Sequence, residues 1–313
     1  MALVQVDLIT GFLGAGKTTF LRRYVQALVA QGHNVCILEN DFGAVNVDAM
    51  LVQDLLGPRC DVETISGGCD CDTHQRRMRT KLIAMAMRGF DRVVVEPSGI
   101  FDVDEFFDVL RDDPLDRWYQ LGSVIAIVDA MLPGTLSPQA EYLLASETMN
   151  AGRVLLSRVL QAGPDRCRAV CARLEQALEA CHCSRRFAPG EVLAADWDAL
   201  TDADFAQLAS CGHRQASCEK LHFDAHEAFG ALCFLERKQT PEQLSAAADR
   251  LFADPACGRV LRVKGFAPAA GGWVELNATA AGKTLAPIPQ GQDVLIVIGE
   301  GLDRTAIEAR LGD

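Results

Sequence analysis

Residues 11–18, GFLGAGKT, restrict the fold of this chain more than any other stretch, because they match the pattern G-x-x-x-x-G-K-[ST]. An apolar run, VQVDLIT, comes directly before them, and TTFLRRYVQALVAQG, with apolar residues at helical spacing, follows. In such a strand, loop and helix unit, the loop N–H groups and the helix N-terminus surround a polyphosphate. We therefore expect nucleotide contacts from Gly11, Gly14, Ala15, Gly16, Lys17, Thr18 and Thr19.

The first two thirds of the chain predict a P-loop NTPase domain of the α/β class. Runs rich in Val, Ile and Leu recur at residues 4–10, 34–40, 92–99, 123–130 and 153–159, with helical stretches between them. Continuous apolar runs are typical of strands buried on both faces of a mainly parallel, doubly wound sheet. We expect this nucleotide-binding domain over residues 1–212 and a smaller α+β domain over residues 213–313.

Composition limits the partners and the compartment. The formal net charge of -12 and the pI near 5.0 argue against binding to nucleic acid, whose phosphates most of this surface would repel. No stretch approaches the roughly 20 apolar residues that span a membrane, and the first residues lack the features of a secretion signal. The 12 cysteines then indicate reduced thiols and a cytoplasmic protein.

Acidic residues follow the predicted strands, at the edge where parallel sheets bind ligands. Thr18 is expected to hold magnesium through its hydroxyl, and Glu39 or Asp41 to bind it directly or through water. Glu96 occupies the strand-end position of a Walker-B acid, with Gly99 close to the γ-phosphate. The alternative is that these acids cap the following helices, and for Asp129 a helix cap or a turn cap is the favoured role.

Together these stretches resemble the CobW family of GTPases, relatives of the HypB and UreG nickel-insertion proteins. The resemblance rests on GFLGAGKTT, ENDFG, ISGGCDCDT, VEPSG, VIAIVDA, RVLRVKGF, WVEL and VLIVIG, in that order over nearly the whole chain. It implies a GTPase domain followed by a smaller α+β domain. It also implies that GTP binding or hydrolysis drives the delivery of a metal to a client protein.

The sequence departs from the family pattern at two places. The cysteine cluster, usually Cys-x-Cys-Cys in the family, reads Cys69-Asp70-Cys71-Asp72. The guanine-reading motif, normally Asn-Lys-x-Asp, reads Ser157-Arg158-Val159-Leu160, and Leu160 cannot accept the two hydrogen bonds that guanine donates to an aspartate. Ser157 and Arg158 remain expected nucleotide contacts, guanine preference rests on the resemblance, and other nucleotides stay open.

The cysteine cluster has the composition of a metal site. Thiolates at i and i+2 can bind one ion from a tight turn, which Gly67 and Gly68 permit. Cys69, Cys71 and Asp72 supply two sulfurs and one oxygen, a set that suits zinc or cobalt(II) better than copper(I). The candidates for a fourth ligand are Asp70, His74, Cys60 and water. A structural or redox role is the alternative.

Other cysteine, histidine and basic residues have ordinary interpretations. We expect buried helical cysteines, not a second metal site, at Cys167, Cys171, Cys181 and Cys183. His222 and His226 are expected to be a strand or surface pair. Residues 74–81, HQRRMRTK, are expected to form a solvated helix face, with client docking or phosphate contact as the alternative.

The whole sequence predicts a magnesium-dependent NTPase that hydrolyses GTP. Its intrinsic hydrolysis rate is expected to be slow, because no arginine finger is evident within the chain. Its expected role is that of a metallochaperone or an activator of a metal- or corrinoid-dependent enzyme, and a homo-oligomer is left open. Lys17 and Glu96 are the expected catalytic residues, and the magnesium ligands come from Thr18, Glu39, Asp41 and Glu96. The alternatives are a nucleotide-gated switch that remodels a partner without metal, and an ATP-dependent kinase of a small molecule.

Overall fold

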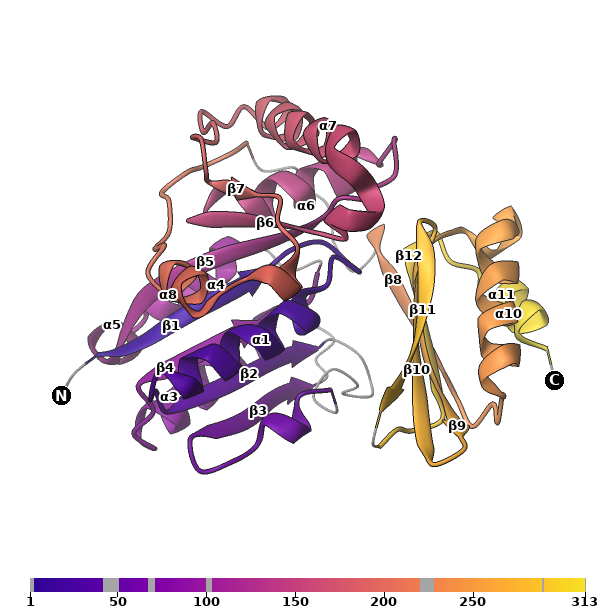
Figure 1. Ribbon diagram of the computed structural model, residues 1–313, viewed down its shortest axis with the longest axis horizontal. Helices are drawn as coiled ribbons and strands as arrows, with labels where there is room; N and C mark the ends of the chain where they lie inside the picture. Colours follow the sequence, from indigo (N-terminus) through magenta and orange to yellow (C-terminus); the bar gives the residue numbers. More distant parts are fainter. Residues whose placement is uncertain are drawn as a thin grey trace. The chain divides into compact units, whose positions relative to one another are not determined.

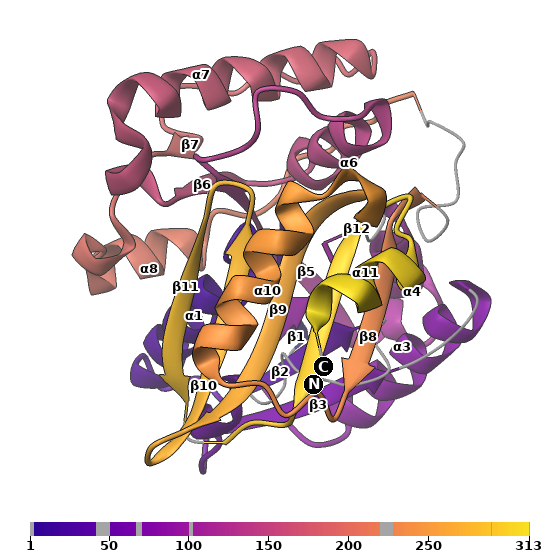
Figure 2. The same ribbon diagram turned by 90° about the vertical axis from the view of Figure 1, so that its right-hand side faces the viewer.

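The computed structural model describes residues 3–41, 51–66, 71–99, 103–219, 228–288 and 290–312. The chain forms two compact units, which are drawn in Figures 1 and 2. The first consists of Met1–Leu132 and Leu136–Leu221, and the second of Pro133–Thr135 and His222–Asp313. Each unit has its own hydrophobic core and is described by itself.

The first unit is built around a seven-stranded parallel sheet with the order β3-β2-β4-β1-β5-β6-β7. The strands are β1 Val4–Thr10, β2 Val35–Asp41, β3 Cys60–Ser66, β4 Arg92–Glu96, β5 Tyr119–Asp129, β6 Arg153–Ser157 and β7 Val192–Leu193. Strands β1, β4 and β6 are buried along almost their whole length, as is the second half of β5. This burial explains why their sequences are continuous in Val, Ile and Leu.

Helices cover both faces of this sheet. They are α1 Lys17–Ala30, α3 Cys71–Ala86, α4 Val103–Arg111, α5 Leu115–Trp118, α6 Pro138–Met149, α7 Val159–Ala180 and α8 Asp202–Leu208, with short 3-10 turns at Gln53–Leu55 and Trp197–Ala199. Both views place α1 and α8 on one face and α3 and α4 on the other (Figures 1 and 2). The expected P-loop NTPase fold with a mainly parallel, doubly wound sheet is confirmed.

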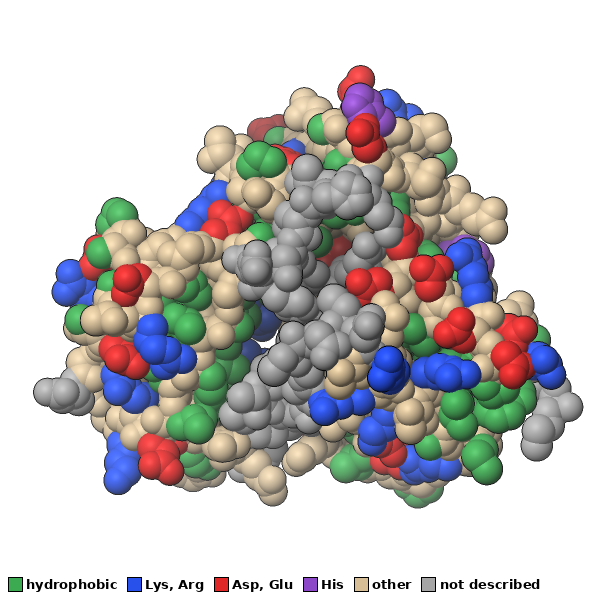
Figure 3. All heavy atoms as spheres, turned by 180° about the vertical axis from the view of Figure 1, so that it is seen from behind, with side chains coloured by type: hydrophobic (Ala, Val, Ile, Leu, Met, Phe, Trp, Pro, Cys, Tyr) green, Lys and Arg blue, Asp and Glu red, His purple; other side chains and the backbone are tan. Residues whose placement is uncertain are grey.

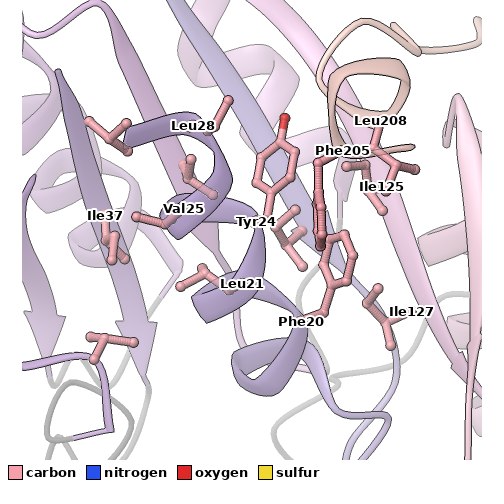
Figure 4. Close-up of a cluster of buried hydrophobic side chains, with 14 of the residues drawn as sticks. Phe20, Leu21, Tyr24, Val25, Leu28, Ile37, Ile125, Ile127, Phe205 and Leu208 are labelled. Atoms are coloured by element: carbon pink, nitrogen blue, oxygen red, sulfur yellow. The ribbon is translucent and has the colours of Figure 1, made fainter. Parts of the chain in front are cut away.

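One cluster of buried hydrophobic side chains in the first unit packs around α1 (Figure 4). The core side chains of this helix recur at helical spacing and are at most 1% exposed: Phe20, Leu21, Tyr24, Val25 and Leu28. They pack on Ile9, Ile37, Ile125 and Ile127 of the strands and on Phe205 and Leu208 of α8. Each large apolar side chain buried in this way contributes about 1.5–3 kcal/mol, so α1 is held firmly on the sheet.

The two edge strands of this sheet, β3 and β7, were not predicted from the sequence. Strand β3 reads CDVETIS and is only half-buried from Asp61 to Thr64, so it lacks the continuous apolar run of the central strands. Strand β7 contains two residues. An edge strand pairs on one side only and tolerates polar residues, which removes the pattern by which the other strands are predicted.

A buried polar network joins β1, β4, β5 and α1. Asp7 is fully buried, and 2.9 Å separates its Oδ2 from Nη1 of Arg92. The Tyr24 hydroxyl and the Ser123 N–H each donate to Asp7 at 2.8 Å. A Cβ atom on Gly122 would lie 2.4 Å from the same carboxylate, so a side chain does not fit there. Burial raises the pKa of Asp7, and the charge of Arg92 opposes this effect.

The second unit is a five-stranded antiparallel sheet with the order β11-β10-β9-β12-β8. Its elements are β8 Gly230–Leu235, α10 Pro241–Ala253, a 3-10 turn at Pro255–Cys257, β9 Arg259–Ala269, β10 Gly272–Thr279, β11 Gly282–Ile288, β12 Val294–Glu300 and α11 Arg304–Leu311. Helices α10 and α11 cover one face of the sheet (Figure 2). The expected α+β fold of this part is confirmed, although the exposed edge strand β11 was not predicted.

The first unit extends further along the chain than the predicted boundary between residues 212 and 213, since it continues to Leu221. The Arg214 N–H donates to the Asn150 carbonyl at 2.9 Å, and the Glu219 N–H donates to the Cys181 carbonyl at 2.8 Å. These bonds hold the segment on the first unit. They join residues far apart in sequence, so composition does not reveal them.

Candidate functional site

The predicted phosphate loop connects β1 to α1 and has an unusual backbone. The φ angles of Gly11, Gly14 and Gly16 are 140°, 76° and 101°. A Cβ atom on Gly11 would lie 2.2 Å from the carbonyl oxygen of Ile127, so only glycine fits this position. Helix α1 begins at Lys17, with Gly16 as its N-cap residue. Since the first N–H groups of a helix have no partner within it, this loop has the backbone of an anion site.

Lys17 and Gly99 meet inside this loop. Lys17 is 7% exposed, and its Nζ donates to the Gly11 carbonyl oxygen at 2.7 Å. Gly99 follows β4, and a Cβ atom added there would lie 3.0 Å from Nζ of Lys17 and 2.7 Å from the backbone nitrogen of Leu13. The segment after β4 therefore packs directly on the loop, and a side chain at position 99 would occupy the loop's own space.

Thr18 and two acids form a group of oxygen donors beside the loop. The Thr18 hydroxyl donates to Oε1 of Glu96 at 2.9 Å, although the two residues are 78 positions apart. Glu39 on β2 is the register partner of Glu96 on β4, and the two residues are 2% and 5% exposed. The hydroxyl bonded to Glu96 and the second buried carboxylate on the neighbouring strand are hard oxygen ligands of the kind that Mg²⁺ prefers. The side chain of Asp41, the other expected ligand, lies outside the described residues.

Two further expected nucleotide contacts lie between β6 and α7: Ser157 ends the strand, and Arg158 is the N-cap residue of the helix. Ser157 lies beside the loop, with its Cβ 3.8 Å from the position that a Cβ on Gly16 would take. Arg158 has a φ angle of 55°, and its Nε donates to Oδ1 of Asp129 at 2.8 Å. Burial lowers the pKa of Arg158 from its usual value. Leu160, in the first turn of the helix, is 79% exposed.

Asp129 and Trp197 complete this side of the loop. Asp129 accepts a hydrogen bond from the Met131 N–H at 2.8 Å, which confirms its expected role as a turn cap. The ring of Trp197 lies 3.4 Å from the Cβ position of Gly16 and packs edge-on against Phe20, with 5.5 Å between ring centroids. Sequence reasoning missed Trp197, because nothing in the surrounding ADWDAL indicates that this segment returns to the loop.

Glu147, on α6, is a second residue that the sequence analysis missed. It is 1% exposed, and neither carboxylate oxygen has a hydrogen-bond partner within the described residues. Burial raises the pKa of Glu147 well above its usual value, while the charge of Lys17 acts in the opposite direction. Glu147 therefore lies within electrostatic reach of Lys17 and keeps its proton to higher pH than an exposed glutamate does.

The side chains expected to bind a transferable metal, Cys69, Cys71 and Asp72, lie outside the described residues, as do those of Asp70 and His74. Cys60 can be placed. It begins β3, about 20 Å of strand away from Ser66 at the other end, and burial raises the pKa of its thiol to about 11. Cys60 as a candidate fourth ligand stays a prediction, because Cys69 lies outside the described residues.

The cysteines on and after α7 lie within the described residues. Cys167, Cys181 and Cys183 are buried and Cys171 is half-buried. Among the residues that the structure describes, no group of three or more His, Cys, Asp or Glu side chains is arranged to hold a metal. His222 and His226 lie outside those residues. In the described ranges, no helix has both the length and the apolar character needed to cross a membrane.

Comparison with known sequences identifies related proteins. The family model of the CobW/HypB/UreG nucleotide-binding domain matches residues 5–183. The chain is 32% identical over 170 residues to the zinc chaperone YjiA of Escherichia coli (strain K12), which covers 51% of each protein. It is 30% identical over 132 residues to the zinc-regulated GTPase metalloprotein activator 1 of Schizosaccharomyces pombe, which covers 40% of this chain and 32% of that protein. The matched part thus spans about half, or less, of the length of these curated relatives.

Solved structures that align with this chain include those of YjiA and HypB. The Zn(II)-bound YjiA GTPase from E. coli aligns over 99% of this chain and 98% of its own, with a TM-score of 0.40 and 23% identity. The hydrogenase maturation factor HypB from Archaeoglobus fulgidus aligns over 56% of this chain and 76% of its own, with a TM-score of 0.34 and 14% identity.

Proposed function

The chain belongs to the CobW/HypB/UreG family, and from this premise we propose that it binds and hydrolyses GTP and thereby transfers zinc to a client metalloprotein. The observation that carries the proposal is the hydrogen bond between Thr18 and Glu96, next to Lys17. P-loop NTPases place a loop hydroxyl, a strand-end acid and a lysine in this way around the β- and γ-phosphates. The relatives named zinc chaperone and GTPase metalloprotein activator support the same function.

Each residue of the site has a role in this proposal. The loop N–H groups hold the phosphates, and Lys17 exchanges its bond to the Gly11 oxygen for phosphate oxygens, where it stabilises charge in the transition state. Thr18, Glu39 and Glu96, together with Asp41, hold magnesium, which neutralises the phosphate charge. Glu96 also orients the attacking water. We expect slow intrinsic turnover.

The metal to be transferred is proposed to bind Cys69, Cys71 and Asp72. Zinc is the first choice because the curated relatives are named for zinc, and because two thiolates and a carboxylate suit its tetrahedral preference. Cobalt(II) accepts the same ligands. In sequence the cysteines follow β3, whose neighbour β2 carries Glu39, so a change at the phosphates would reach them through adjacent strand ends.

The kind of client protein is proposed from the names of the same relatives. A metalloprotein that receives zinc is the general form, and a corrinoid-dependent enzyme is the narrower one. The cytoplasm is the proposed site of action.

Base selection is proposed to be weak. Leu160 stands three residues after Ser157 and is 79% exposed, and a hydrocarbon side chain cannot accept hydrogen bonds from guanine N1 and N2. We expect GDP and ADP to bind within about tenfold of one another, and Leu160→Asp to favour GDP by a further factor of about ten or more, as one charged hydrogen-bond acceptor contributes. Calorimetric affinities of both proteins for both nucleotides measure this.

The nucleotide site is tested by Lys17→Ala, with the exposed Lys283→Ala of the second unit as matched control. We expect Lys17→Ala to abolish GTP binding in calorimetry and Lys283→Ala to leave it unchanged. Unaltered affinity in the Lys17 variant would exclude this loop as the phosphate site.

The metal function is tested by titrating the protein with zinc and with cobalt(II), with and without a non-hydrolysable GTP analogue. We expect cobalt–thiolate charge-transfer bands that depend on nucleotide and vanish in Cys69→Ser/Cys71→Ser but persist in Cys167→Ser/Cys171→Ser. Absence of any metal binding would favour a nucleotide-gated switch without metal. A phosphorylated small-molecule product would instead identify a kinase.

A further inference from the structure

A groove of about 460 Å³ lies in the first unit between strand β3 and helix α3. Its walls are Thr64 and Ile65 of β3 and Thr73, Arg76, Arg77, Thr80 and Lys81 of α3. The five helix residues stand at i, i+3, i+4, i+7 and i+8, so they form one face of α3. Among the described residues, this lining contains three basic side chains, three hydroxyls and no acid.

The groove is positively charged in a protein whose formal net charge is -12. Helix α3 reads CDTHQRRMRTKLIAMA, in which a single acidic residue accompanies Arg76, Arg77, Arg79 and Lys81. Lys81 is paired with Glu63 at 2.6 Å, whereas the exposed Arg76 makes no ion pair within the described part of the chain. Figure 3 shows Lys and Arg side chains gathered on the face of the first unit that carries α3. The local field therefore attracts an anionic partner.

The β3 wall of the groove is an open sheet edge. Among the described strands, β3 is outermost and pairs with β2 alone. The Val35 N–H donates to the Arg59 carbonyl at 2.8 Å, so the backbone groups of residue 59 point toward β2. The N–H and C=O groups of successive residues point to opposite edges of a strand, and those of Val62 and Thr64 therefore point away from β2. The Val62 N–H is bonded to the Asp61 carboxylate at 2.8 Å. Thr64, which also lines the groove, is then the position where a further strand can pair.

We propose that this groove binds an extended, carboxylate-rich segment of the client protein. Alternate side chains of an extended segment point the same way about 7 Å apart, so its carboxylates reach Arg76 and Arg77 while its backbone pairs with Thr64. A long anion such as RNA fits less well, because the net charge of the protein repels it.

The position of the groove connects it to metal transfer. Its lining residues Ile65 and Thr73 stand on either side of the proposed ligands Cys69 and Cys71 in the sequence. A client segment held there would be bound next to the chain that carries the metal. The identity of the partner as a client rests on the proposed function, whereas the binding itself needs neither hydrolysis nor metal.

The test measures binding of a fluorescein-labelled twelve-residue peptide of alternating Glu and Val to the full chain by fluorescence anisotropy. We expect Arg76→Glu/Arg77→Glu to weaken binding roughly tenfold or more, and the same peptide with Gln in place of Glu to bind equally weakly. Arg168→Glu on α7, whose side chain is 73% exposed, is the matched control and should bind as the native protein does. Binding should also weaken as salt rises.

Further variants separate the possible outcomes. Arg76→Glu alone should weaken binding less than the double variant does, and it replaces the double variant if the latter folds poorly. Thr64→Pro should weaken binding without changing the charge of the groove. Failure of the native protein to bind the peptide, an equal loss in Arg168→Glu, or tighter binding of oligouridylate that is lost in the same variants would overturn the proposal. The double variant should keep native GTP hydrolysis and zinc affinity. If the native protein neither hydrolyses GTP nor binds zinc but still binds the peptide, the proposed function is contradicted and the groove proposal stands.

Discussion

At the residue scale, Gly99 is a position of the nucleotide site that has no room for a side chain. A Cβ atom there would lie 2.7 Å from the Leu13 nitrogen and 3.0 Å from Nζ of Lys17. Gly99→Ala must therefore push the phosphate loop away from its place, and overpacking of this kind costs about 1–3 kcal/mol. We predict that nucleotide affinity, measured by calorimetry, falls about ten- to a hundredfold.

The matched control for this substitution is Gly134→Ala, because no heavy atom lies within 4 Å of the added carbon at that position. It should leave nucleotide affinity unchanged. Equal affinities of the Gly99→Ala and native proteins would show that the loop does not depend on this contact.

Glu147 gives a pH-dependent prediction at the same scale. Burial raises its pKa above the usual 4.5 in the folded protein. Above about pH 4.5 the unfolded chain releases this proton while the folded protein keeps it, so the free energy of unfolding falls as pH rises until the folded pKa is reached. Glu147→Gln does not titrate. We predict that its melting temperature exceeds the native value by about 2 °C or more at pH 8, and by less at pH 5.

The exposed residue Glu179 supplies the control for Glu147. Glu179→Gln should follow the native protein at both pH values, because this side chain lies on the surface of α7. A Glu147→Gln shift of the same size at pH 5 and at pH 8 would contradict a role for proton release.

At the element scale, the network around Asp7 fixes β1, β4, β5 and α1 relative to one another. Asp7→Ala would leave Arg92 buried without its partner, and breaking a buried pair on one side costs about 3–5 kcal/mol. We predict a loss of this size in urea unfolding. Tyr24→Phe removes one neutral donor to the same carboxylate and should cost about 1 kcal/mol.

A double variant distinguishes the ion pair from simple packing. Asp7→Leu/Arg92→Met replaces both charges with apolar groups and should lose clearly less stability than the sum of the two single changes. Additive losses would mean that the two charges do not act as a pair.

At the scale of the whole molecule, the two units have separate cores, and all described residues proposed to bind nucleotide lie in the first. A ligand that binds only the folded form stabilises it by about 2.7 kcal/mol at a concentration of 100 times its Kd. We predict two transitions in scanning calorimetry, of which only the larger one moves to higher temperature with GDP. A shift of both transitions by the same amount would show that the units unfold together.

Several elements were predictable because their signals are local. The phosphate loop is a run of eight residues, and β1, β4 and β6 are continuous in Val, Ile and Leu because both of their faces are buried. The edge strands β3 and β11 were not predicted, because a strand at the edge of a sheet, with many of its side chains partly or fully exposed, needs no continuous apolar run. The burial of Glu147 was not predicted either, because a single acid in a helix does not reveal that the helix is buried on all sides from Tyr142 to Met149.

The sequence by itself determined the phosphate loop, the parallel sheet and the division into an α/β and an α+β part, because these follow from short-range spacing and continuous burial. Only the tertiary structure decided that Thr18 bonds to Glu96, that Glu39 lies opposite Glu96, and that Gly99 packs on Lys17. It also decided the burial of Glu147 and the groove beside α3. Contacts of this kind depend on distances between residues far apart in the chain, which strand order sets and local spacing does not.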